Sequence, residues 1–187
     1  MVESRSLPTM TDTERLATLL AHHEIGEVIH RYCRGIDRMD WDLVRGCYHP
    51  DAVDDHGDFV GTIDEFIPYI QAGLPRFERT QHFIGNLMVE LDGDTARAET
   101  YLVAYHRLRA NATKPERDFV VGLRYVDDFA RRAGEWRIAS RVCAFEWSRI
   151  DPVAAGGWTL APRATTGQRD RTDVVYAPSL VAPKLDC

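Results

Sequence analysis

The sequence lacks the cysteine spacing of a disulfide framework or a zinc site. Its 187 residues include four cysteines, which form no CxxC pair and stand at no Cys/His spacing typical of zinc. We therefore expect free thiols in a reducing compartment. These cysteines are Cys33, Cys47, Cys143 and Cys187.

Several other signals are also missing. No apolar run approaches the ~20 residues that a membrane-spanning helix needs, and the N-terminal segment has no basic stretch followed by a long apolar core. The net charge is -6, whereas a nucleic-acid-binding face is basic. Glycine-rich phosphate loops and a GxSxG elbow are absent. We expect a cytoplasmic protein that binds neither nucleic acid nor membrane.

What is present is an ordinary globular composition, with 44% hydrophobic and 28% charged residues, in a length that suits one compact domain. Helical periodicity dominates the first 75 residues, with a short extended stretch at 52–60 and a turn at 56–58. The first predicted helix begins near Thr11 and ends near His23. Further helices are predicted over 24–39, 41–47 and 64–74.

Strand patterns follow, over 80–91, 95–108, 118–129 and 136–147, separated by short turns and one polar loop. Consecutive long strands predict an antiparallel meander, and helices that precede the strands predict an α+β layer fold. Such long strands curl, and a curled sheet closed by helices forms a pocket. We therefore expect a cone-shaped α+β domain over residues 11–150.

Residues 151–187 show weaker patterning, broken by glycines and prolines. We interpret this segment as an extended arm that crosses its own domain or a neighbouring subunit; the alternative is a partly disordered tail. Its apolar residues need a surface to cover, so we predict a homodimer or homotrimer partly built by the arm. These residues are Trp158, Leu160, Val174, Val175 and Tyr176.

Two polar residues near the end of the second predicted helix could do chemistry. The Tyr32 hydroxyl can donate a hydrogen bond to a substrate oxygen, and the Asp37 carboxylate can orient a histidine base where the helix ends. The alternative is that Tyr32 is a core residue with its hydroxyl at the rim, and that Asp37 only caps the next helix.

The first predicted long strand carries a histidine on an apolar face. Alternation places His82, Ile84, Asn86 and Met88 together, with Leu87 on the opposite face. A histidine and an asparagine there need polar partners, which favours a polar spot in a cavity. The alternative is an exposed strand start.

Two further strand residues are weaker candidates. His106 could form a two-histidine pocket, or be a satisfied edge histidine. Arg141 could be a pocket cation, or a surface strand arginine. The acidic and histidine residues of 49–56, Asp54 and His56 among them, have no recognised ligand spacing. We expect that cluster to be solvated, and we predict no metal and no cofactor.

Six segments carry a resemblance to a known family: residues 29–37 (IHRYCRGID), 40–44 (DWDLV), 47–52 (CYHPDA), 82–86 (HFIGN), 96–105 (ARAETYLVAY) and 134–138 (GEWRI). They resemble the SnoaL-like family of the nuclear-transport-factor-2-like superfamily, over about Thr13 to Trp147. The resemblance implies the α+β cone fold. It does not fix the reaction, because this family includes dehydratases, isomerases, cyclases, dehydrochlorinases and binding modules.

Within that family, Tyr32, Asp37 and His82 resemble the active site of bile-acid 7α-dehydratases. The pair Asp37 and His82 is also similar to the dyad of hexachlorocyclohexane dehydrochlorinases, and His82 with His106 to the histidines of scytalone dehydratases. Halide elimination is less favoured, because the dehydrochlorinase's basic residues have no clear match here.

These residues favour a cofactor-independent lyase or isomerase with Asp37, His82 and Tyr32 as catalytic residues. His106, Asn86, Met88 and Arg141 would contact a hydrophobic polycyclic or aromatic ligand. The alternatives are a non-catalytic binding or assembly module, and a small subunit of a ring-hydroxylating oxygenase. An Asp37 carboxylate within hydrogen-bond reach of His82, beside an open cavity, would distinguish the enzyme from both.

Overall fold

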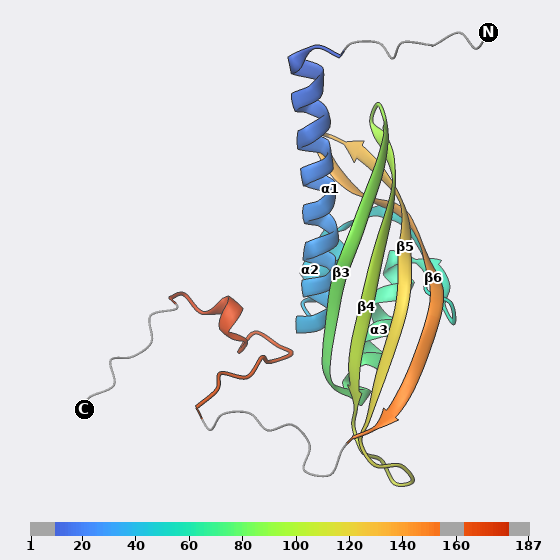
Figure 1. Cartoon of the computed structure of the whole chain (residues 1–187), viewed down its shortest axis with the longest axis vertical. Coiled ribbons are helices and arrows are strands. Elements are labelled where there is room, and N and C mark those ends of the chain that lie inside the picture. The colour runs from blue at the N-terminus through green and yellow to red at the C-terminus, as the bar shows by residue number, and fades with distance from the viewer. Residues whose placement is uncertain (1–9, 154–162, 180–187) are drawn as a thin grey trace, which may run out of the picture.

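The computed structural model describes residues 10–153 and 163–179 (Figure 1). The described residues form three α-helices and six strands. All three α-helices precede the four long strands, which follow one another directly, and this order confirms the α+β class. The helices are α1 (Asp12–Arg38), α2 (Trp41–Gly46) and α3 (Ile63–Gly73), with 3₁₀ turns η1 (Leu74–Arg76) and η2 (Val174–Tyr176). The strands are β1 (Tyr48–Asp55), β2 (Val60–Thr62), β3 (Phe77–Asp92), β4 (Thr95–Leu108), β5 (Arg117–Arg132) and β6 (Glu135–Pro152).

The first two predicted helices are one continuous helix, so the break expected at His23 is wrong. Thr11 and Glu14 form a capping box at the start of α1, and no proline occurs within this helix. Met39 ends the helix in the left-handed region, at φ 50°. The first half of α1 is mostly exposed and only the second half packs on the sheet, which is why the apolar pattern changes midway.

The six strands form one open sheet in the order β2-β1-β6-β5-β4-β3. The hairpins between β3, β4, β5 and β6 are antiparallel, as predicted, and these long strands twist and curve beside α1 (Figure 1). The pair β1–β6 is parallel, so the sheet is mixed. Strands joined by tight turns must run antiparallel, whereas β1 and β6 are far apart in sequence and are free of that constraint.

The core lies between the inner face of the sheet and the helices. Helix α1 contributes residues at helical spacing, and the strands contribute alternate residues, as one buried face requires. Among the most buried side chains are Ile25, Ile29 and Phe66 from the helices and Ala98, Leu123, Tyr125 and Ile138 from the sheet. This arrangement turns the inner-facing residues of β3, β4 and β5 toward the C-terminal half of α1.

Residues 163–179 pack against the junction of α1 and α2. Asp40, which caps α2, accepts hydrogen bonds from Arg171 at 3.0 Å and from the Tyr176 hydroxyl at 2.9 Å. This part of the predicted arm therefore covers its own chain. Trp158 and Leu160 lie outside the described residues, and the division of the chain at residue 150 stays a prediction.

The described cysteines and the lengths of the helices can be compared with the expectations from the sequence. Cys33, Cys47 and Cys143 are buried, free thiols, as expected, and Cys187 lies outside the described residues. Over residues 10–153 and 163–179, the helices are too short or too polar to cross a bilayer.

Candidate functional site

Asp37 and His82 form a hydrogen-bonded pair across the contact between α1 and β3. The Nδ1 atom of His82 lies 2.8 Å from Oδ1 of Asp37, and the backbone N–H of His82 donates to Oδ2 at 3.0 Å. The two side chains are 9% and 10% exposed. One carboxylate thus fixes both the ring and the backbone of His82, although 45 residues separate the two in sequence.

The contacts with His82 keep the Asp37 carboxyl group ionised. Burial alone would raise the pKa of Asp37, but the charge and the hydrogen bonds of His82 outweigh it and lower that pKa below its ordinary value. An ionised Asp37 only accepts hydrogen bonds, so Nδ1 of His82 carries the proton. The Nε2 atom is left as the basic nitrogen of the ring.

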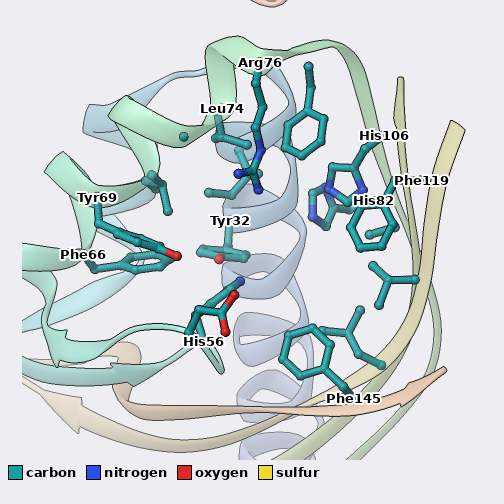
Figure 2. A pocket seen from close by; sticks show the side chains of 18 of the residues that line it. Tyr32, His56, Phe66, Tyr69, Leu74, Arg76, His82, His106, Phe119 and Phe145 are labelled. Carbon is teal, nitrogen blue, oxygen red and sulfur yellow. The ribbon is translucent and has the colours of Figure 1, made fainter. Parts of the chain in front are cut away.

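His82 lines a cavity of about 530 Å³ between the helices and the inner face of the sheet (Figure 2), and Asp37 holds it from behind that wall. Most of the wall is apolar, from α1, α3, η1 and the middle of the long strands. A volume of this size and an apolar lining with few polar groups are typical of small-molecule sites. The polar or titratable side chains at the wall are Tyr32, His56, Asp58, Tyr69, Arg76, His82 and His106.

Tyr32 is at the wall, as predicted for a hydrogen-bond donor. Its ring packs edge-on against Tyr48 at 5.8 Å and Tyr125 at 5.6 Å between ring centroids. Burial raises the pKa of Tyr32 well above its ordinary value, so the hydroxyl keeps its proton. A protonated phenol held on two sides can donate to an oxygen in the cavity.

His106 lies beside His82, with its ring edge-on at 5.7 Å between centroids. Burial, and then the nearby His82, lower the pKa of His106 to about 3. The ring is therefore neutral at pH 7, and its Nδ1 atom is buried without a hydrogen-bond partner among the described residues. His106 is at the cavity, but it has no carboxylate to make it a strong base.

Arg141 does not line the cavity, which corrects its predicted role in binding a ligand. Its side chain is buried on β6 and donates to both carboxylate oxygens of Asp127 at 2.7 Å. Its guanidinium carbon lies 4.1 Å from the ring centroid of Tyr32 and 3.9 Å from that of Tyr125. Arg141 thus supports Tyr32 from behind by cation–π contact.

Asn86 and Met88 also lie outside the cavity, and the physical reason is a bulge. Ile84 pairs with Leu102 and Leu87 with Thr100, so two residues of β3 face one residue of β4. The extra residue reverses the alternation, and Leu87 takes the inward face expected for Asn86 and Met88. Asn86 is consequently exposed, and Met88 is 56% exposed.

His56 and Asp54 were expected to be solvated, and this expectation is wrong. Asp54 is fully buried and accepts from the Tyr48 hydroxyl at 2.6 Å, while His56 lines the cavity with Nδ1 2.9 Å from Asp54. Alternation from buried Ala52 to Asp54 and His56 could have indicated an inward face.

The remaining members of that cluster do not converge. The Nε2 atom of His49 lies 2.8 Å from the carbonyl oxygen of Ala130, and Asp51 forms an exposed ion pair with Arg132. In the part of the chain that the structure describes, no group of three or more histidine, cysteine or acidic side chains could hold a metal ion.

Comparisons with known proteins agree with the fold. The SnoaL-like domain profile matches residues 17–142. An uncharacterised Mycobacterium tuberculosis protein, Rv2910c, is 32% identical over 123 residues, which cover 64% of this chain and 81% of that protein.

Three solved structures share the fold at low identity. A Kribbella flavida protein, Kfla4162, has a TM-score of 0.65 and 22% identity, covering 71% of this chain and 95% of that one. A Novosphingobium aromaticivorans protein, provisionally described as a scytalone dehydratase, has a TM-score of 0.66 and 17% identity, covering 76% and 95%. A hexachlorocyclohexane dehydrochlorinase from Novosphingobium barchaimii has a TM-score of 0.64 and 16% identity, covering 81% and 100%.

These structures support the architecture alone, whereas the profile spans most of the chain. It runs from residue 17 in α1 to residue 142 in the first half of β6, and it includes both residues of the Asp37–His82 pair. By sequence and by fold, this chain belongs to the SnoaL-like domain family.

Proposed function

We propose that this protein is a cofactor-independent lyase or isomerase, of the dehydratase type, that acts on a hydrophobic polycyclic or aromatic small molecule. The observation that carries the proposal is the Asp37–His82 pair, joined at 2.8 Å at the wall of an apolar cavity. A carboxylate that orients a histidine at the wall of a cavity is an arrangement suited to general-base catalysis.

In the proposed reaction, Nε2 of His82 removes a proton from a carbon next to a carbonyl. Asp37 stabilises the imidazolium that forms, because its carboxylate already accepts from Nδ1. Negative charge then builds up on the carbonyl oxygen, and the Tyr32 hydroxyl donates a hydrogen bond to it. The resulting enolate either expels a leaving group, as in a dehydratase, or takes the proton back at another carbon, as in an isomerase.

The substrate class follows from the cavity. Its wall offers aromatic and aliphatic side chains such as Phe66, Ile70, Phe119 and Phe145 around a smaller set of polar groups. A polycyclic or aromatic ketone or alcohol would fill about 530 Å³ and leave its oxygen near Tyr32 and His82. The dehydratase and dehydrochlorinase names of the similar structures suggest the same reaction class.

The site favours an enzyme over a binding module. Burying a carboxylate and a histidine together has a desolvation cost that an apolar pair of the same size would avoid. A module that only binds an apolar ligand has no need of that pair, and neither has an oxygenase subunit that acts through its surface.

The first prediction tests this mechanism directly. With a panel of hydroxylated and ketonic polycycles, monitored for loss of water or for a shifted double bond, Asp37→Asn and His82→Ala should each lower turnover about 10²–10⁴-fold. The double variant should be little worse than either single one, because the two residues act as a unit. Tyr32→Phe should cost less, since it removes one hydrogen bond.

Met88→Ala is the matched control, because Met88 lies on β3 but outside the cavity. Circular dichroism establishes that each variant folds. Folded Asp37→Asn and His82→Ala variants that turn over a substrate at the wild-type rate would refute the mechanism.

A further inference from the structure

The cavity holds a second histidine–carboxylate pair that the proposed mechanism does not use. His56, just after β1, lines the cavity and stacks at a tilt on Phe66, with 5.0 Å between ring centroids. Figure 2 shows its side chain on the helix α3 side of the cavity, across from His82. Asp54 of β1 holds the ring of His56, whereas Asp37 of α1 holds the ring of His82.

The buried charges behind His56 are unbalanced without it. Asp54 and Asp127 are both fully buried and close enough that the charge of Asp54 helps to raise the pKa of Asp127, after the larger effect of burial. The guanidinium of Arg141 is the positive charge beside Asp127, and both of its hydrogen bonds go to that carboxylate. Tyr48 donates a hydrogen bond to Asp54 but brings no charge. A proton on His56 would supply the missing positive charge.

The other groups around the ring are compatible with a cation. The Sγ atom of Cys143 lies 3.3 Å from Nδ1 of His56, and burial raises the pKa of that thiol well above its ordinary value, so it remains neutral. Asp58 lies at the same cavity and adds a further acidic group. The ring therefore contacts a carboxylate and a thiol, while the hydrogen bonds of Arg141 go to Asp127.

We propose that His56, oriented by Asp54, is the general acid that protonates the leaving oxygen of the substrate. This assignment rests on the proposed function, in which His82 is the base. The C–H bond breaks and its proton goes to His82; the C=C bond forms; the C–O bond breaks, and the oxygen takes a proton from His56. The products are an unsaturated ketone and one water, and solvent exchange returns the proton from His82 to His56.

Two substrates with different leaving groups test the assignment. A β-hydroxy ketone with a naphthyl group and its 4-nitrophenyl ether give the same enone, but hydroxide must be protonated to leave while 4-nitrophenolate leaves unassisted. His56→Gln should slow loss of water about 10²–10⁴-fold and leave release of 4-nitrophenolate within a few-fold of wild type. His82→Ala should slow both reactions, since both need the base.

The outcomes separate the two proposals. If His82→Ala slows neither reaction, the base assignment fails. If His82→Ala slows both reactions but His56→Gln affects both leaving groups equally, or neither, then His56 has no acid role and the present inference is overturned. His22→Gln, an exposed histidine on α1, serves as the control.

A second variant leaves the His56 ring in place. Asp54→Asn keeps the shape of the side chain but removes the carboxylate that orients His56. It should slow loss of water and leave release of 4-nitrophenolate within a few-fold of wild type. An Asp54→Asn variant that loses water at the wild-type rate overturns the proposal.

Discussion

The three histidines of the cavity differ in what holds them, and this difference sets their chemistry. His82 and His56 each have a carboxylate on Nδ1, from Asp37 and Asp54. His106 instead lies between the rings of Phe77 and Phe119, at centroid distances of 4.7 and 5.4 Å. A histidine among aromatic rings stays neutral, because burial penalises its charged form.

The next prediction concerns the stability of the fold in acid. The pKa of His106 is about 3 in the folded chain and ~6.5 in an unfolded one. Below about pH 6.5 the unfolded state therefore binds a proton that the folded state excludes, and stability falls by up to about 1.4 kcal/mol per pH unit. His106→Phe should remove this slope, as measured by urea unfolding between about pH 7 and about pH 4.5.

The pH range keeps the Asp37 carboxyl group out of the measured slope. The pKa of Asp37 is lowered in the folded chain, so its contribution is kept above the ordinary aspartate value of ~3.9 and is lost only below it. His22→Gln, on the exposed face of α1, is the control. A His106→Phe variant with the acid slope of wild type would contradict the prediction.

The sequence could not establish these residue-scale partners by itself. Spacing on α1 left Asp37 open as a simple helix cap, and only the family resemblance favoured the pair with His82. The partner is 45 residues away, on another element, and no local pattern encodes that contact. Arg141 was misjudged for the same reason, because its partner Asp127 lies on the neighbouring strand.

At the scale of elements, the strands were easier to predict than their faces. Glycine at φ 58° in the turn after β3 and at φ 84° in the turn before β6 gives clear boundaries, and β4 was predicted with its observed bounds. The bulge of β3 was not predicted, because a single inserted residue depends on pairing with β4 rather than on the sequence of β3. It reversed the faces of Asn86 and Met88.

The segment 163–179 makes contacts at the cavity rim that lead to a third prediction. Arg169 donates through Nη1 to the carbonyl oxygens of Leu74 at 3.0 Å and Phe77 at 2.8 Å, which flank the turn η1. Leu74 and Phe77 both line the cavity. Arg169→Ala should lower the free energy of unfolding by about 1–3 kcal/mol, since two charge-assisted hydrogen bonds are lost. Urea unfolding measures this change.

The same variant should expose the rim to solvent exchange. Amide hydrogen exchange of Leu74, Arg76 and Phe77 should accelerate in Arg169→Ala more than exchange in the sheet does, because the lost bonds hold this turn. Arg163→Ala, an exposed arginine of the same segment, is the matched control. Unchanged stability and unchanged exchange at the rim would show that the segment does not support the cavity.

At the scale of the whole molecule, the helices cover one face of the sheet, and apolar side chains lie on the other. Phe83, Val103, Gly122 and Trp147 are register partners across β3, β4, β5 and β6. Phe83 is 68% exposed and Trp147 is 49% exposed, with the Trp147 ring lying over Gly122. We call this row, together with Tyr101, the outer row. Adjacent exposed aromatic residues of this kind mark an interaction surface more often than a free one.

The last prediction assigns the proposed homodimer or homotrimer to the outer row. Residues 163–179 already cover their own chain, and the outer row is an exposed apolar surface that a second copy could bury. Phe83→Lys should shift the full-length protein toward monomer in sedimentation velocity, because a charge at the centre of an apolar interface loses its hydration without gaining a partner. It should not affect folding, since Phe83 contributes little buried area. Leu19→Lys, equally exposed on the N-terminal half of α1, should leave assembly unchanged. A wild-type monomer at micromolar concentration, or a Phe83→Lys variant that assembles like wild type, would contradict the assignment.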